Sequence, residues 1–107
     1  MGEVEELLYN AARYGNDNEV AYLVRAGADL HWRSNAGWTA VHLACYMGHE
    51  AVVQSLANAG ADLNLPDDSN TSTPLITASS RGFDAIVDIL LKAGANLNQN
   101  NNATSYL

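Results

Sequence analysis

Three side chains near the middle of the chain have the types and spacing of a metal site, or of a thiol nucleophile with its base. His42, Cys45 and His49 stand at i, i+3 and i+7, which would place all three on one face of a single helix. Gly48 argues against such a helix, because glycine commonly ends one. A cysteine nucleophile also needs a cleft and oxyanion donors, which a cysteine packed between helices lacks. We therefore expect no metal site, no cofactor and no catalysis, with two hydrogen-bonding histidines and a small buried thiol instead.

Two other patterns match the acceptor sequence for N-glycosylation, Asn70-Thr71-Ser72 and Asn102-Ala103-Thr104. In a chain this rich in Asn, Ser and Thr, about one such match arises by chance. We give neither pattern a function.

Composition and charge exclude several classes of protein. The 107 residues, 48% hydrophobic and 16% charged, suit one small globular domain. The net charge of −7 argues against nucleic acid, because binding to phosphates relies on Lys and Arg. No apolar run approaches the roughly 18 residues of a membrane span, the acidic N-terminus does not resemble a signal peptide, and the single cysteine suits a reducing compartment. We expect an intracellular protein with neither nucleic acid nor membrane as partner, cytoplasmic with the nucleus left open.

The spacing of the glycines indicates an internal repeat. Six of the eight glycines form two series with intervals of 33 and then 34 residues: Gly15, Gly48 and Gly82, and Gly27, Gly60 and Gly94. Such a period is typical of stacked units that bury their apolar faces against neighbours. We divide residues 1–98 into repeats 1–33, 34–66 and 67–98. Residues 99–107 form an Asn-rich polar tail or, alternatively, a truncated fourth repeat. The longer interval places one extra residue between Asn64 and Thr73.

Each repeat predicts two short helices. The first begins at a capping hydroxyl, Thr39 or Thr73, and ends near Gly48 or Gly82. The second begins with an acid that suits the positive end of the helix dipole: Asp17, Glu50 and Asp84. Its apolar residues stand at i, i+3 and i+4: Val20, Leu23 and Val24; Val53, Leu56 and Ala57; Val87, Leu90 and Leu91. Small residues on the first helices allow close packing: Ala11, Ala12, Ala44, Cys45, Ala78 and Ser79.

The two ends of the array are expected to differ. The C-terminal end is expected to be apolar, because the last predicted helix carries Ile86, Ile89 and Leu90. This end is open if the chain is a piece of a longer array. Alternatively, another molecule, such as a second copy of the chain, covers it. The acidic residues around Glu3 and Glu19 give the first repeat the polar surface of a cap.

These repeats resemble the ankyrin repeats. The family motif, Gly-x-Thr-Pro-Leu-His-x-Ala-Ala-x-x-Gly-His followed by Gly-Ala-Asp-Val-Asn, matches Gly37 to Asn64 with few departures, and three copies are in register over roughly residues 4–98. The resemblance implies an all-α solenoid of stacked helix-turn-helix units, with β-hairpin-like fingers at residues 32–38 and 65–72 and a partial one at 98–104. The departures are Tyr9 and Ile76 at the position of His42, Ser34 for the turn aspartate that Asp67 supplies, and Thr71 where a glycine is expected.

The resemblance also implies a non-catalytic module that binds a partner protein or peptide through its concave helix face and finger tips. The residues predicted for binding are Tyr14, Trp32, Arg33, Asn35, Trp38, Tyr46, Met47, Asp67, Asp68, Asn70, Ser80 and Arg81. The fold also leaves Asn10, Arg13, Ala36, Ser69 and Ser72 free. Aromatic and Arg side chains dominate many interfaces. The alternative is that Trp32 and Trp38 cover the bases of fingers and that Tyr46 packs on its neighbour. An acidic tip at Asp67 and Asp68 beside the aromatic residues predicts a partner with an apolar anchor flanked by basic groups.

Two other functions remain open. The repeats are alternatively a targeting segment of a larger enzyme or ligase-recruiting protein. A weaker alternative is self-association through the uncapped C-terminal end, so we expect a monomer or a weak oligomer.

Overall fold

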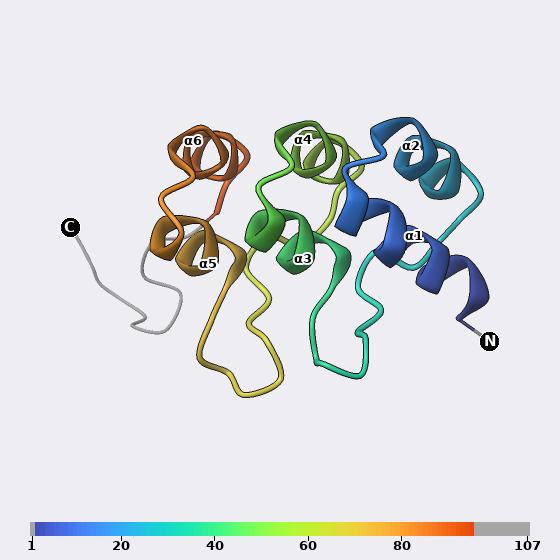
Figure 1. The fold of residues 1–107 in the computed structure, drawn as a ribbon, viewed down its shortest axis with the longest axis horizontal. Helices are drawn as coiled ribbons and strands as arrows, with labels where there is room; N and C mark the ends of the chain where they lie inside the picture. Colours follow the sequence, from blue (N-terminus) through green and yellow to red (C-terminus); the bar gives the residue numbers. More distant parts are fainter. Residues whose placement is uncertain (1, 96–107) are drawn as a thin grey trace.

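The computed structural model describes residues 2–95, and within them the fold consists of six helices and no strand. The helices are α1 (Glu3–Tyr14), α2 (Asp17–Arg25), α3 (Ala40–Met47), α4 (Glu50–Asn58), α5 (Pro74–Ser80) and α6 (Asp84–Lys92). They form three pairs that stand side by side, with α1, α3 and α5 in one layer and α2, α4 and α6 in the other (Figure 1). This arrangement confirms the all-α repeat solenoid. The expected tail at 99–107 and partial finger at 98–104 lie outside the described residues.

The helix ends follow from local chemistry, as expected from the sequence. The hydroxyl of Thr39 accepts a hydrogen bond from the backbone N–H of His42, and the hydroxyl of Thr73 does the same for Ile76. These bonds satisfy N–H groups that have no partner inside the helix. The helices α2, α4 and α6 each begin at the predicted acid. Gly48 ends α3 in the left-handed conformation, with φ 85°.

One continuous apolar core runs through all three pairs. Helix α3 contacts both α1 and α5, and α4 contacts both α2 and α6. Ala12, Ala44 and Ala78 are fully buried, so small side chains let the first helices approach closely. Ser79 was expected to share this role, but it is exposed because α5 is the last first-layer helix within the described residues.

The buried face of α6 differs from the expected one. Ile86 and Leu90 are buried, Val87 is half-buried, and Leu91 is 40% exposed. The expectation that Ile86 and Leu90 form an open apolar end is therefore wrong, since both face the core. Val53, the counterpart of Val87, is fully buried because α4 has neighbours on both sides, whereas residues 2–95 place a helix on only one side of α6.

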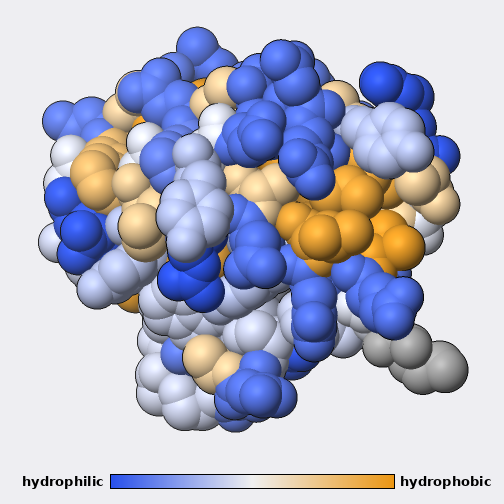
Figure 2. Space-filling model, turned by 45° about the vertical axis from the view of Figure 1, so that its right-hand side comes forward, coloured by the Kyte–Doolittle hydropathy of each residue, from blue (hydrophilic) through white to orange (hydrophobic). Residues whose placement is uncertain are grey.

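The N-terminal end of the stack is less polar than expected. Val4 is 36% and Leu7 51% exposed on the outer side of α1. In Figure 2 an orange apolar patch lies among blue polar side chains at this end of the molecule. The prediction of a polar cap is therefore wrong in part: Glu3 and Glu19 are exposed there, but the i, i+3 pair of Val4 and Leu7 is also open.

The connections between repeats project from the helical stack as two fingers, finger 1 (residues 32–38) and finger 2 (residues 65–72) (Figure 1). One backbone hydrogen bond closes each: Ser34 N–H to the carbonyl of Trp38 at 2.9 Å, and Asp67 N–H to the carbonyl of Ser72 at 2.8 Å. Finger 2 therefore contains the predicted extra residue. Its left-handed residue is Asn70, with φ 64°.

Thr71 was expected at a glycine position, and the structure corrects this. The extra residue shifts the left-handed position to Asn70, the counterpart of Gly37. Asn tolerates this conformation better than a β-branched residue does.

Candidate functional site

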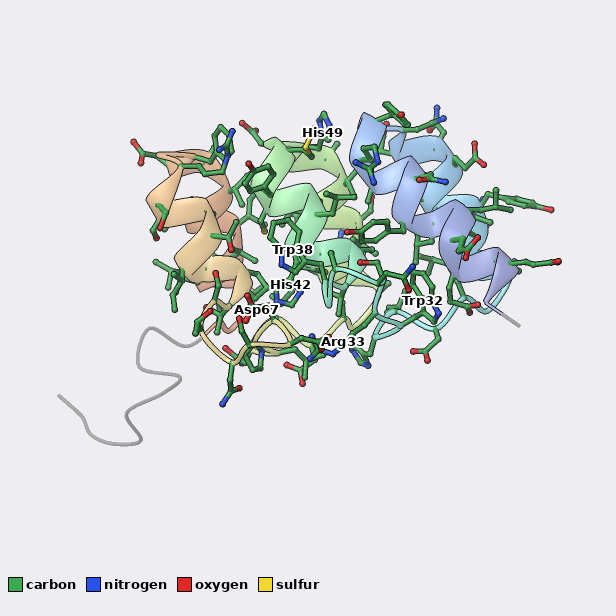
Figure 3. All side chains as sticks on the ribbon, turned by 60° about the horizontal axis from the view of Figure 1, so that its bottom comes forward. Trp32, Arg33, Trp38, His42, His49 and Asp67 are labelled. Atoms are coloured by element: carbon green, nitrogen blue, oxygen red, sulfur yellow. The ribbon has the colours of Figure 1, made fainter. Side chains whose placement is uncertain are left out.

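The first helices and the fingers border one side of the molecule, the concave face. Helices α1, α3 and α5 line it, and the two fingers project along its edge (Figure 1). Figure 3 shows Trp32 near the N-terminal pair and Trp38 close to His42 beside α3. Apart from Arg81, which directly follows α5, the side chains predicted for binding belong to these helices and fingers.

An aromatic and cationic group, the concave cluster of Trp38, Tyr46, Arg81 and Phe83, joins the second and third repeats. The rings of Trp38 and Tyr46 meet edge to face with centroids 5.2 Å apart. The guanidinium of Arg81 lies 4.2 Å from the ring centroid of Tyr46 and 5.5 Å from that of Phe83. Tyr46 and the adjacent Met47 are each 41% exposed. The cluster is thus held in place by the fold and still presents aromatic surface to solvent.

The two fingers are joined by polar and steric contacts. The guanidinium of Arg33 donates a 2.8 Å hydrogen bond to the carbonyl of Gly37 and lies 3.8 Å from the carboxylate of Asp68. A Cβ atom on Gly37 would lie 2.5 Å from the side chain of Asp68, so this glycine allows the close approach of finger 2. Arg33 and Asp68, both predicted for binding, therefore also hold the fingers together.

Asp67 shapes the turn of finger 2. One carboxylate oxygen accepts hydrogen bonds from the N–H of Thr71 at 3.0 Å, the N–H of Ser72 at 3.3 Å and the hydroxyl of Ser69 at 3.1 Å. The bond from Thr71, helped by those from Ser69 and Ser72, lowers the pKa of this carboxyl group. Asp68, with its side chain 66% exposed, is the more accessible acid of the predicted tip.

The remaining predicted residues lie in three places. Trp32 is half-buried and packs edge to face on Tyr9, with ring centroids 6.1 Å apart. Tyr14 is 76% exposed and borders a hollow with Leu7 and Glu19, apart from the concave cluster. The others are exposed: Asn35 and Asn70 in the fingers, Ser80 at the end of α5.

The three residues with metal-site spacing do not converge. His42 Nδ1 accepts from the N–H of Thr39 at 3.1 Å, and His49 Nε2 lies 2.8 Å from the carbonyl of Arg13 in the preceding repeat. His49 also lies well apart from His42 (Figure 3). Burial raises the pKa of the Cys45 thiol to about 12. Within residues 2–95 there is no group of three or more His, Cys, Asp or Glu placed to hold a metal ion.

Burial has the opposite effect on His42, which is only 1% exposed. Desolvation lowers the pKa of this imidazole, and the positive charge of Arg33 adds to the effect, while the carbonyls of Leu65 and Ser72 and the charge of Asp67 oppose it. His42 is thus a neutral cap of α3 at neutral pH.

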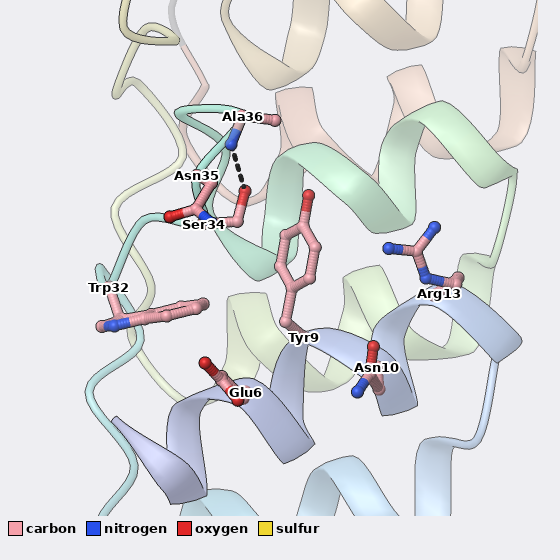
Figure 4. Close-up of a pocket in the computed structure, with 8 residues that line it drawn as sticks. All are labelled: Glu6, Tyr9, Asn10, Arg13, Trp32, Ser34, Asn35 and Ala36. Atoms are coloured by element: carbon pink, nitrogen blue, oxygen red, sulfur yellow. Dashed lines mark hydrogen bonds between the residues drawn. The ribbon is translucent and has the colours of Figure 1, made fainter. Parts of the chain in front are cut away.

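A pocket of about 390 Å³ between α1 and finger 1 includes residues that sequence reasoning missed. This Tyr9 pocket is lined by Glu6, Tyr9, Asn10 and Arg13 from α1, and by Trp32, Ser34, Asn35 and Ala36 from finger 1 (Figure 4). Tyr9 had been noted only as a departure from the repeat motif. Phe83 was likewise missed in the concave cluster, although it stands at the position of His49 one repeat later. In both cases the signal in the sequence was an aromatic residue where the second repeat has a histidine.

None of the helices in the described part of the chain is long and apolar enough to cross a bilayer.

Comparison with known proteins agrees with the geometry. The family model of ankyrin repeats (3 copies) matches residues 7–101. Oxysterol-binding protein-related protein 1 of Rattus norvegicus is 46% identical over 76 residues, which cover 62% of this chain and 8% of the relative. Mitochondrial disaggregase of Bos taurus is 37% identical over 99 residues, covering 92% of this chain and 14% of the relative. Protein phosphatase 1 regulatory subunit 27 of Homo sapiens is 41% identical over 61 residues, covering 57% and 40%.

The chain thus spans less than half the length of each of these relatives. Ankyrin repeats are generally protein-interaction modules without enzymatic activity. The chain folds into three stacked helix pairs, and Thr39 and Thr73 cap two of the first helices. Together with the family match over most of its length, this shows that the chain belongs to the ankyrin-repeat family.

Proposed function

We propose that this chain is a non-catalytic module that binds a partner protein or peptide on its concave face and finger tips. The partner carries an apolar anchor flanked by basic groups. The observation that supports this proposal best is the concave cluster, where Tyr46 and Met47 remain exposed beside Arg81 and Trp38.

This cluster has the composition of an interface hot spot. Tyr, Trp and Arg are enriched among interface residues whose truncation costs about 2 kcal/mol or more. Tyr46 is held from two sides, by the edge of Trp38 and by the guanidinium of Arg81, so it loses little conformational freedom on binding. Asp68 at the neighbouring finger and the net charge of −7 favour basic groups around the anchor.

Affinity capture from the native cell tests this proposal. The bait proteins are the wild-type chain and a Trp38→Ala/Tyr46→Ala/Met47→Ala triple variant, followed by affinity measurements with the purified captured protein. We expect the triple variant to lose the partner, and Tyr46→Ala alone to weaken it by about 2 kcal/mol.

Tyr22→Ala is the matched control. Tyr22 is 65% exposed on α2, in the layer away from the concave face, so its truncation removes exposed aromatic surface at a different place. Helical content and melting temperature should be nearly the same in all variants. Equal losses of affinity in Tyr22→Ala and Tyr46→Ala, or a parallel loss of fold and binding in the triple variant, would contradict the proposal.

A second candidate is that these repeats target a larger enzyme or ligase-recruiting protein to its partner. It is supported by the relatives, which are much longer proteins: the matched segments cover only 8 to 40% of their lengths. The mass of the native protein, measured on the species that a repeat-specific antibody captures, distinguishes the two: a mass near 11.4 kDa would overturn this candidate.

Self-association is the weaker candidate, supported by the exposure of Ile76 and Leu91 in the third repeat. Light scattering across a concentration series tests it. A monomeric mass at every concentration would end this candidate.

A further inference from the structure

We propose that the Tyr9 pocket receives a lysine or arginine side chain of the bound partner. The inference rests on the proposed function and deepens it, because it assigns one basic group of the partner to one site. The pocket lies between α1 and finger 1, and two of its lining residues, Glu6 and Tyr9, were not among the positions that the sequence left free for binding (Figure 4).

Two aromatic rings form an angled wall of the pocket. The planes of Tyr9 and Trp32 meet at 73°, and both residues are half-buried. Such rings attract a cation through the negative potential of their faces. The indole of Trp32 also packs near the backbone of Gly2, since a Cβ atom there would lie 3.1 Å from Nε1. The contact between the two rings orients this wall.

Glu6 supplies a free negative charge at the same place. Its side chain is exposed and forms no hydrogen bond or salt bridge with any other described residue. Figure 4 shows its carboxylate on α1, on the side of the pocket below the rings of Trp32 and Tyr9. A carboxylate next to aromatic rings favours a lysine ammonium or an arginine guanidinium over a neutral chain of the same length.

Arg13 is the lining group that could instead favour an anion. Its guanidinium lies 5.7 Å from the ring centroid of Tyr9, so the ring already accommodates this cation. The carbonyl of Arg13 is within 2.8 Å of the imidazole of His49, which ties this residue to the second repeat. An anionic ligand would also lie close to Glu6 in a chain of net charge −7. Glu6 and Arg13 balance each other in the lining, so the preference for a basic ligand rests on the aromatic faces and on the negative charge of the chain as a whole.

The two aromatic residues of the pocket differ from their counterparts in the second repeat. Tyr9 and Trp32 stand where the second repeat has His42 and Leu65. His42 is buried and caps α3, whereas Tyr9 is half-buried and open to the pocket. The side-chain amides of Asn10 and Asn35 border the opening and can bond to the backbone of a peptide.

A peptide library tests the assignment. Nine-residue peptides carry random flanks and a fixed central residue, which is Lys, Arg, norleucine or Glu, and each set is titrated against the chain. We expect the Lys and Arg sets to bind more tightly than the norleucine set, and the Glu set least tightly. Glu6→Gln should reduce the preference for Lys over norleucine by about two- to fivefold, the usual range for an exposed ion pair. Tyr9→Leu, which keeps an apolar wall, should reduce it by a similar factor of about two to five.

Glu3→Gln is the matched control, since Glu3 is exposed on the same helix but does not line the pocket. It should leave the preference unchanged. Equal effects of Glu3→Gln and Glu6→Gln would show attraction by net charge alone and overturn the proposal. A preference for the Glu set would assign the pocket to an anion and do the same.

The library also separates this inference from the proposed function. If peptides bind without any central preference and Tyr46→Ala abolishes their binding, the inference falls and the proposed function stands. If no set binds to the wild-type chain, the inference falls, and the capture experiment decides the proposed function.

Discussion

Alanine substitutions at Gly48 and Gly82 can distinguish two contributions to the free energy of unfolding. One is the cost of the left-handed backbone, and the other is the packing of one repeat on the next. Both adopt the left-handed conformation, with φ of 85° and 78°. A Cβ atom on Gly48 would lie 2.9 Å from Cζ of Phe83 in the next repeat, whereas a Cβ atom on Gly82 would meet nothing within 4 Å. Alanine at either position is therefore strained, but only at Gly48 does it also collide with the neighbouring repeat.

The expected magnitudes follow from these two contributions. The left-handed conformation costs a residue with a Cβ atom about 1–2 kcal/mol, which is the whole effect expected for Gly82→Ala. Gly48→Ala must also displace the ring of Phe83, and overpacking of this kind adds about 1–3 kcal/mol. The total for Gly48→Ala is about 2–5 kcal/mol, which is a large part of the stability of a small domain.

Urea unfolding followed by circular dichroism at 222 nm measures both free energies of unfolding. The same pair of variants in a Phe83→Ala background provides the control. We expect the excess effect of Gly48→Ala over Gly82→Ala to disappear once the ring is removed. Equal destabilisation by the two substitutions in the wild-type background, or an excess that survives Phe83→Ala, would refute the stacking of Phe83 on the preceding repeat.

Two other substitutions test the core and the buried cap. Leu56→Ala in α4, where the side chain is fully buried, should lower the free energy of unfolding by about 2–5 kcal/mol in urea denaturation, and a change below about 1 kcal/mol would contradict the packing of this helix. Burial lowers the pKa of His42 in the folded chain below its ordinary value of 6.5, so its contribution to stability is complete above pH 6.5. As the pH falls from there toward the folded pKa, only the unfolded chain takes up the proton, and stability should fall by up to about 1.4 kcal/mol per pH unit. Urea denaturation at several pH values should show this slope in the wild-type chain and lose it in His42→Gln; an unchanged slope in the variant would assign it to another group.

The local rules of helix formation allowed much of this fold to be predicted. Thr39 and Thr73 are strong capping residues, and the acids that begin α2, α4 and α6 suit the helix dipole. These signals depend only on neighbours in the sequence. They were sufficient to place the beginnings of α2, α3, α4, α5 and α6, whereas α1 begins without a side-chain cap.

The errors arose where the outcome depends on contacts between repeats. Leu91 matches the apolar spacing of a buried position, but it is 40% exposed because no described helix packs beyond α6. The shift of the left-handed residue from Thr71 to Asn70 depends on how finger 2 accommodates its extra residue. Spacing along the chain does not carry this information.

The sequence predicted which residues take part in the candidate site better than it predicted which of their side chains contact one another. Trp38 and Tyr46 were both predicted for binding, and their rings are in contact. Trp32 instead pairs with Tyr9, which is distant in the sequence and had been judged only as a missing histidine. Asp67 is used by its own turn, as expected of the turn aspartate, although it was also predicted for binding.

The central claim is that a partner binds on the concave face, and hydrogen exchange of the chain with and without its captured partner tests it most directly. We expect slower exchange on binding in fingers 1 and 2 and at the C-terminal ends of α3 and α5, where Tyr46, Met47 and Arg81 lie. Amides of α2, α4 and α6 should exchange at nearly unchanged rates. Protection confined to α2, α4 and α6 would contradict the account.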